Sequence, residues 1–144
     1  MATTTYTVSR EIQAPPHVVW DLLTDPSSYR DWNPAVLSIE GAMSTGSTIK
    51  LVSIASPQRT FSLTVTSMEA PVRMVWSDGM PLGLFRGVRT YRLDPTGAGT
   101  AFSMTEKFSG PLAGLIAKSI PDLTDSFNQF ADGLRIAAER AAHE

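Results

Sequence analysis

The sequence predicts an α+β domain in which a curved antiparallel sheet of seven strands wraps around one long C-terminal helix. Two observations lead to this expectation. Between residues 35 and 109 the chain alternates apolar and polar residues in short runs, which is typical of strands with one dry and one wet face. Beyond residue 110 apolar residues instead recur every three or four positions, which is typical of a helix with one buried face.

The N-terminal part predicts one strand followed by two short helices. Residues 6–13 alternate, and only Arg10 breaks their apolar face. The apolar spacing becomes helical after the Pro-Pro pair at 15–16, and proline is well suited to a first helical turn. An Asp-Pro pair ends this helix, and residues 27–32 predict a second, short one.

Six further strands are expected before the C-terminal helix. Gly, Pro, Asp and Ser separate the alternating runs, and the run 58–68 alternates most clearly. The loop Asp94–Gly99 lies between the last two runs and predicts a hairpin. The expected strands are 35–40, 47–55, 58–68, 72–77, 85–93 and 100–109.

The C-terminal apolar stripe is long enough to cover the sheet. It runs from Leu112 to Ala141, and Pro121 predicts a break or a kink within it. A main helix over 121–142 would be about 33 Å long at 1.5 Å per residue. Because a curved sheet that closes on one helix often leaves a hollow, we expect a ligand site between the two.

Composition excludes several classes of protein. The 144 residues are 42% hydrophobic and 18% charged, which fits a single domain spanning 1–144. The net charge of -2 and the absence of a basic cluster make nucleic acid an unexpected partner. No apolar run is long enough to cross a membrane, and the first residues lack the basic region of a signal peptide. We therefore expect a cytoplasmic protein without integral membrane association.

Residue types also limit the chemistry. The chain has no cysteine and two histidines, His17 and His143, neither with a partner at metal-ligand spacing, so we expect no metal site and no cofactor. A Gly-x-Ser-x-Gly elbow and the glycine fingerprints of nucleotide sites are absent. Any catalysis would rely on carboxylates, Arg, Tyr and hydroxyl groups.

Several segments carry a family resemblance. The stretch 14–26, with Tyr29, Trp32, Asn33-Pro34 and Val36 after it, resembles the START-related SRPBCC superfamily. Val75-Trp76, Leu84-Phe85 and Thr105–Gly110 are similar to its bacterial polyketide cyclase/dehydrase-like branch. The resemblance covers nearly the whole chain and implies the helix-grip fold. It does not imply one activity, since the superfamily includes carriers, receptors, cyclases and co-chaperones. Many members carry a histidine on the strand that is 85–93 here, where this chain has Arg89 and its neighbours, so chemistry based on that histidine does not transfer.

Two charged residues fall on the apolar faces of the last two strands. Arg89 shares a face with Phe85 and Tyr91, and Glu106 shares one with Phe102 and other apolar residues. A register that opposes Leu93 to Phe102 would set Arg89 across from Glu106, whereas a shift of two residues would leave them diagonal. Such a pair is either an internal ion pair that fixes the sheet or a polar anchor for a ligand. Arg10 is an alternative partner for Glu106.

Aromatic and thioether side chains are expected to line the hollow, although each of them also suits an ordinary core. The loop 78–84 presents apolar residues between glycines and either gates the mouth or simply connects two strands. The predicted ligand-binding residues are Trp32, Phe61, Met74, Trp76, Met80, Phe85, Arg89, Tyr91, Phe102, Met104, Glu106, Phe127 and Phe130.

These features favour a cofactor-free carrier or binder of a small hydrophobic molecule, such as a lipid, a polyketide or an aromatic metabolite. An alternative is an enzyme of the polyketide cyclase or dehydratase kind, in which Glu106 or Tyr91 moves protons and Arg89 stabilises an enolate. A third is an interaction module related to the Hsp90 co-chaperones. The carrier is favoured because no histidine reaches the expected hollow and no second inward carboxylate is evident. The oligomeric state is left open.

Overall fold

The sheet is an antiparallel meander to which the N-terminal strand is added at one edge. The computed structural model describes residues 4–144. The strand order is β1-β7-β6-β5-β4-β3-β2, so the predicted seven-stranded antiparallel sheet is confirmed. The strands are β1 Thr4–Ile12, β2 Val36–Glu40, β3 Thr48–Ser53, β4 Ser56–Glu69, β5 Arg73–Gly79, β6 Arg86–Pro95 and β7 Thr100–Ser109.

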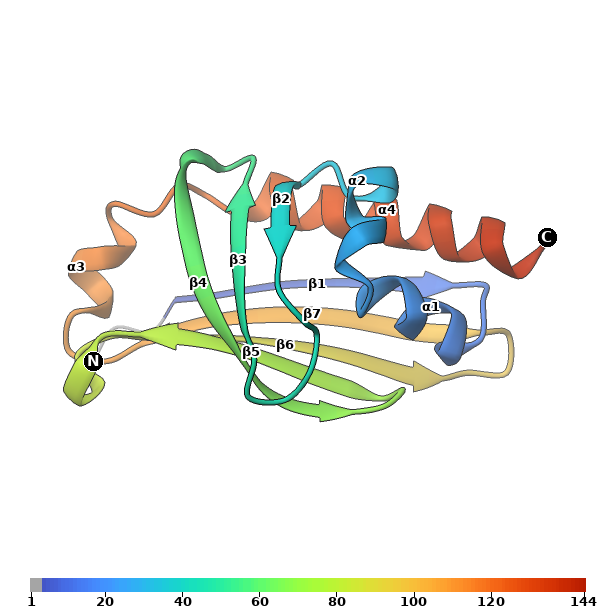
Figure 1. Ribbon diagram of the computed structural model, residues 1–144, viewed down its shortest axis with the longest axis horizontal. Coiled ribbons are helices and arrows are strands. Elements are labelled where there is room, and N and C mark those ends of the chain that lie inside the picture. The colour runs from blue at the N-terminus through green and yellow to red at the C-terminus, as the bar shows by residue number, and fades with distance from the viewer. Residues whose placement is uncertain (1–3) are drawn as a thin grey trace.

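Helices cover the inner side of this sheet. Figure 1 shows α4 lying along the length of the molecule, with α3 at one end and α1 at the other, while β2 and β3 stand upright across the remaining strands, so that the sheet curls around α4. The helices are α1 Pro16–Leu23, α2 Tyr29–Trp32, α3 Ala113–Ala117 and α4 Thr124–Ala142, with single 3-10 turns η1 Pro26–Ser28 and η2 Pro81–Gly83. Among residues 4–144, no helix combines the length and apolar character that a membrane span requires.

The main C-terminal helix begins three residues later than predicted, at Thr124 instead of 121. Pro121 lacks an N–H group, and the carboxylate of Asp122 accepts hydrogen bonds from the backbone N–H and the hydroxyl of Thr124, at 2.9 and 2.7 Å. Asp122 therefore lies before the helix and caps its first turn. The apolar stripe that precedes Pro121 forms the separate helix α3.

The half of the fold under α1 and α2 is densely packed. Phe130 of α4 stacks edge-on against Trp32 and Tyr29, with ring centroids 5.5 and 6.0 Å away. A glycine at position 133 permits this approach, because a Cβ there would overlap the carbonyl oxygen of Trp32. Side chains of β1, β6 and β7 complete this core, which leaves the opposite half, near α3, as the place for a hollow.

Candidate functional site

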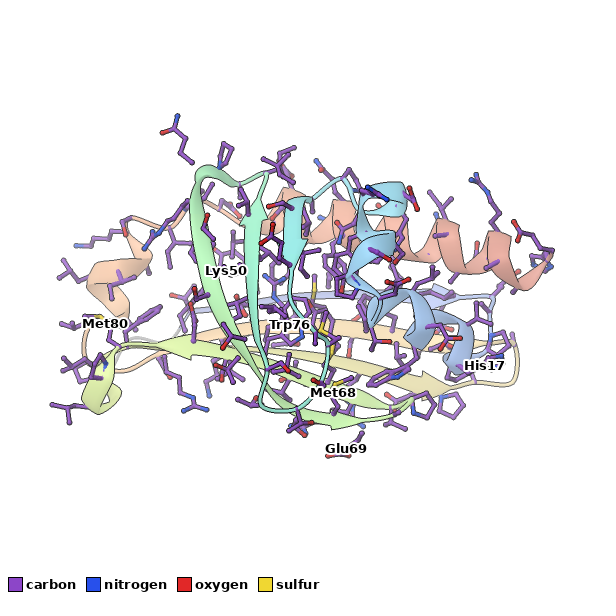
Figure 2. All side chains as sticks on the ribbon, in the orientation of Figure 1. His17, Lys50, Met68, Glu69, Trp76 and Met80 are labelled. Carbon is purple, nitrogen blue, oxygen red and sulfur yellow. The ribbon has the colours of Figure 1, made fainter. Side chains whose placement is uncertain are left out.

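A cavity of about 550 Å³ lies between the inner face of β3–β7 and the segment that joins α3 to α4. This volume is within the roughly 300–1,000 Å³ typical of ligand pockets. Trp76 of β5 lies in the interior between the strands and α4, and Met80 lies near α3 at the end of the molecule (Figure 2). Eight of the predicted ligand-binding residues line the cavity: Phe61, Trp76, Met80, Phe85, Arg89, Glu106, Phe127 and Phe130.

The other predicted lining residues lie in the packed core instead, and this corrects the expectation from residue type. Four of them lie on the inner faces of strands and Trp32 lies on α2, and all five fall within the dense half of the fold that contains α1, α2 and the C-terminal part of α4. None of them is more than 8% exposed. They are Trp32, Met74, Tyr91, Phe102 and Met104.

The charged pair of the cavity is Arg89 on β6 and Glu106 on β7. The two residues are direct partners in the antiparallel register, as are Leu93 and Phe102, so the predicted register is confirmed. The Nε atom of Arg89 lies 3.5 Å from Oε2 of Glu106, and both side chains are about 15% exposed. The guanidinium carbon also lies 4.9 Å from the ring centroid of Phe127. Arg89 is therefore held by a charge on one side and by aromatic rings on others.

Electrostatics keep Arg89 charged. Burial by itself would lower the pKa of Arg89, but Glu106 and Tyr91 outweigh that effect and leave the pKa above its ordinary value. Nη1 of Arg89 donates a hydrogen bond to the hydroxyl oxygen of Tyr91 at 3.5 Å. Burial raises the pKa of Tyr91 well above its ordinary value, with Arg89 acting in the opposite direction. Tyr91 thus stays protonated and contacts the cavity only through Arg89.

Arg10 does not compete for Glu106. Its Nε lies 2.7 Å from Oδ1 of Asp132, and its Nη2 donates to Oδ1 of Asn128 at 2.8 Å. Both partners are on α4, so Arg10 ties β1 to the helix outside the cavity. The alternative pairing of Arg10 with Glu106 is wrong, although the side chain does point toward the helix-covered face.

A second carboxylate in the cavity was missed by sequence reasoning. Asp78 lines the cavity near the end of β5 and is partly buried. Its pKa is raised to about 6, chiefly by burial and then by Glu106, while Arg89 and Arg59 act in the opposite direction. The sequence predicts a strand that ends at residue 77, with the Asp-Gly pair in a loop. The signal was nevertheless present, because Met74, Trp76 and Asp78 continue the same period of two.

The backbone opposite Asp78 leaves room for its carboxylate. Gly87 is the register partner of Asp78, and a Cβ on Gly87 would lie 2.7 Å from Oδ1 of Asp78 and 3.3 Å from the ring of Phe108. Any other residue at 87 would displace the carboxylate, the ring or both. Gly87 therefore fixes where Asp78 can stand on the cavity wall.

A further cationic side chain, that of Arg59, and the connection between β5 and β6 lie at the mouth of the cavity. Arg59 of β4 is exposed, with its guanidinium carbon 5.1 Å from the ring centroid of Phe61. Arg59 was also missed, although it lies two positions from Phe61 and shares its face. In the connection, Met80 lines the cavity and is 43% exposed, whereas Leu82 is 97% exposed. These positions fit both readings of the loop 78–84, a gate and a plain connection.

Within residues 4–144, no three His, Cys, Asp or Glu side chains gather closely enough to hold a metal ion. The cavity wall carries two carboxylates, two guanidinium groups and hydroxyls in an apolar surround. These groups can anchor the polar end of a ligand or transfer a proton to it.

Solved structures share this fold. A protein from Mesorhizobium loti matches with a TM-score of 0.73 at 20% identity, over 95% of this chain and 98% of that one. A protein from Rhodobacter sphaeroides matches with a TM-score of 0.72 at 22% identity, over 98% and 94%. A point mutant of norcoclaurine synthase from Thalictrum flavum, in complex with a transition state analogue, matches with a TM-score of 0.70 at 14% identity, over 97% of both chains. At these identities the likeness concerns the fold.

The sequence comparisons point to one family. No curated protein matches the sequence closely enough to count as a relative. Residues 3–139 match a family described as polyketide cyclase / dehydrase and lipid transport. Because the match covers nearly the whole chain, and the fold is the helix-grip arrangement expected from the resemblance, the protein is a member of the polyketide cyclase / dehydrase and lipid transport family.

Proposed function

We propose that this protein binds a small, largely apolar molecule in the cavity between its sheet and the segment joining α3 to α4. The observation that carries this proposal is the cavity itself, about 550 Å³ with aromatic walls and few charged groups. Residues such as Phe61, Phe85 and Phe127 provide apolar contact area, and the charged groups provide orientation. The family description, which includes lipid transport, supports the same reading.

The Arg89–Glu106 pair anchors the polar end of such a ligand in this proposal. Both side chains line the cavity, and both are engaged with each other on only part of their hydrogen-bonding surface. A buried charged group that contacts a cavity tends to mark a functional site. The competing reading, a purely structural ion pair, predicts that ligand affinity does not depend on either residue.

Native mass spectrometry of the purified protein, together with titration of a hydrophobic fluorescent dye, tests the proposal. Leu63→Trp places a larger ring on the cavity wall, and Leu37→Trp is its control, because Leu37 lies on β2 and is 55% exposed. We expect the wild type and Leu37→Trp to retain a bound molecule or to bind the dye stoichiometrically, and Leu63→Trp to lose this binding. Equal binding by the two Trp variants, or no binding by the wild type, would overturn the proposal.

A specific observation also favours a second function, proton-transfer catalysis in the same cavity. The sequence favours a carrier for two reasons, the lack of a histidine near the expected hollow and the lack of a second inward carboxylate, and Asp78 removes the second of them. Asp78, with a pKa of about 6, and Glu106, fixed by Arg89, give the cavity two carboxylates in different environments. They would serve the cyclase or dehydratase chemistry that the family description includes. Tyr91 does not line the cavity, so we assign it the positioning of Arg89 instead of a catalytic role.

Steady-state kinetics on a poly-β-carbonyl substrate separates the two functions. An enzyme should lose kcat in Asp78→Asn or Glu106→Gln while substrate affinity changes little. A carrier should show no turnover with any such substrate, and the same variants should change affinity alone.

A further inference from the structure

The side chain of Asp78 stands out among the charged groups of the cavity because no other side chain in the described part of the chain pairs with it, although a backbone hydrogen bond at Asp78 itself helps to hold the carboxylate. None of the ion pairs found within residues 4–144 includes it. Its carboxylate stands over the backbone of Gly87 and is partly buried on the cavity wall. A carboxylate has more acceptor sites than one backbone hydrogen bond uses, so the oxygens of Asp78 are available to a hydrogen-bond donor from outside the protein.

The other charged groups are already engaged. Arg89 directs Nε toward Glu106 and Nη1 toward Tyr91, and it packs against aromatic rings. Glu106 uses Oε2 for Arg89. Arg59 is exposed at the mouth and stacks on Phe61. The indole Nε1 of Trp76 has no partner within residues 4–144, but that atom is sealed from solvent and is not accessible to a ligand.

The hydrogen-bonding groups that remain available to a ligand inside the cavity are therefore mainly acceptors. We propose that the cavity selects apolar ligands whose polar end donates hydrogen bonds, a hydroxyl or an ammonium group, and that Asp78 receives this end together with the Arg89–Glu106 pair on the same cavity wall. This inference rests on the proposed binding function and specifies the ligand class of that site. A ligand carboxylate would instead be repelled by the carboxylates of Asp78 and Glu106. Arg89 would compensate little, because it is already paired with Glu106.

Electrostatics support this selection. The charged groups that face Asp78 are Glu106 from β7, Arg89 from β6 and Arg59 from β4. Burial is the largest cause of the raised pKa of Asp78, so an apolar ligand without a donor would raise that pKa further by displacing water. An ammonium group has the opposite effect, because its charge stabilises the ionised carboxylate. Binding of the ammonium ligand should therefore strengthen as pH rises through about 6.

Three probes that share one ring system test the proposal: naphthylethylamine, naphthylethanol and naphthylacetate. Calorimetric titration of the 144-residue protein at about pH 7.5 should rank the amine and the alcohol above the acetate, each by about tenfold, the effect expected for one hydrogen bond to a charged group. The amine should lose affinity at about pH 5, where Asp78 is protonated, and the alcohol should change less.

Two substitutions at Asp78 separate charge from hydrogen bonding. Asp78→Asn keeps an acceptor but removes the charge, so it should weaken the amine about tenfold and the alcohol less. Asp78→Leu removes both and should weaken both ligands. Asp21→Asn is the matched control, since Asp21 is exposed on α1 and does not line the cavity, and it should change nothing. Thermal unfolding of each variant confirms that it is folded.

The outcomes distinguish failure of the inference from failure of the proposed function. If no probe binds and the hydrophobic dye does not bind either, the proposed function is wrong. If the probes bind but naphthylacetate binds as tightly as the others, the donor selection is wrong and Arg59 becomes the candidate anchor for an anionic ligand. A ranking that survives in Asp78→Leu would equally overturn the role of Asp78.

Discussion

Arg89 and Glu106 face each other as direct register partners on β6 and β7, and the Nε–Oε2 distance between them is 3.5 Å. The pair lies where the packed core gives way to the cavity. On the core side, Tyr91 accepts a hydrogen bond from Arg89, and on the cavity side the ring of Phe127 lies against the guanidinium group. A substitution in this pair should therefore affect both the stability of the sheet and the binding properties of the cavity.

Glu106→Gln should lower the free energy of unfolding by roughly 3 kcal/mol. The substitution keeps the shape of the side chain but leaves the guanidinium of Arg89 without a counter-charge, and breaking a buried pair on one side typically costs roughly 3–5 kcal/mol. We expect the lower end of that range, because the cavity lets some water reach both side chains. Urea-induced unfolding followed by tryptophan fluorescence measures the change.

The double variant Arg89→Met, Glu106→Leu provides the control. It removes both charges together, so its stability should lie within about 1 kcal/mol of the wild type, as is common when a buried ion pair is replaced by apolar residues. If the double variant is as unstable as Glu106→Gln, the loss comes from packing and the electrostatic interpretation is wrong.

Asp78 should make the stability of the protein depend on pH in the opposite direction from an ordinary paired carboxylate. Its folded-state pKa of about 6 lies above the ordinary value of 3.8 for an aspartate, so between these two values the folded state binds more protons than the unfolded state. Stability from this group therefore falls as pH rises from about 4 to about 6 and stays low above that. Asp78→Asn should consequently be more stable than the wild type near pH 7.5, and the difference should shrink near pH 4.

Thermal unfolding of both proteins across this pH range measures the difference. Asp25→Asn is a suitable comparison, because Asp25 is exposed and its carboxylate accepts a hydrogen bond from the N–H of Ser27. Because the amide oxygen of asparagine can accept the same hydrogen bond, Asp25→Asn should be no more stable than the wild type at any pH. A constant offset between Asp78→Asn and the wild type would contradict the assignment of the raised pKa to Asp78.

The register and the faces of the last two strands could be predicted because period-two alternation is a local property. Once the loop Asp94–Gly99 is recognised as a hairpin, the opposition of Arg89 to Glu106 follows. Asp78 was missed for an equally local reason: Asp-Gly is a strong turn signal, and it outweighed the alternation that extends β5 by two residues.

The position of the cavity could not be predicted in the same way. Met74, Trp76 and Asp78 share one face of β5, and Met74 and Trp76 are both buried, yet only Trp76 and Asp78 line the cavity. The difference arises from which part of the face α1, α2 and α4 cover, and that depends on contacts between residues far apart in the chain. Gly133, which lets α4 approach the carbonyl of Trp32, is one such contact.

Gly133→Ala should destabilise the fold by about 2 kcal/mol, although alanine is normally favoured in a helix by about 1 kcal/mol. The new methyl group would overlap the carbonyl oxygen of Trp32, so α4 and α2 must move apart. Gly97→Ala is the control, because a Cβ at Gly97 meets no atom within 4 Å. Chemical denaturation of the two variants measures both effects; a stabilised Gly133→Ala would show that the helices are not in close contact.

Leu82 should be replaceable with a gain in stability. It has a φ of 63°, a left-handed conformation that costs roughly 1–2 kcal/mol for a residue with a Cβ, and its side chain is 97% exposed, so little packing offsets this cost. Leu82→Gly should therefore raise the free energy of unfolding by about 0.5–1 kcal/mol. The gain is smaller than the strain that is relieved, because glycine also increases the conformational entropy of the unfolded chain.

Leu115→Gly is the matched control. Leu115 is also exposed but lies in α3, where glycine should lower stability by about 1 kcal/mol. In chemical denaturation, we expect the free energy of unfolding to rise in Leu82→Gly and to fall in Leu115→Gly. An equal loss of stability in both variants would show that Leu82 is not held in the left-handed conformation.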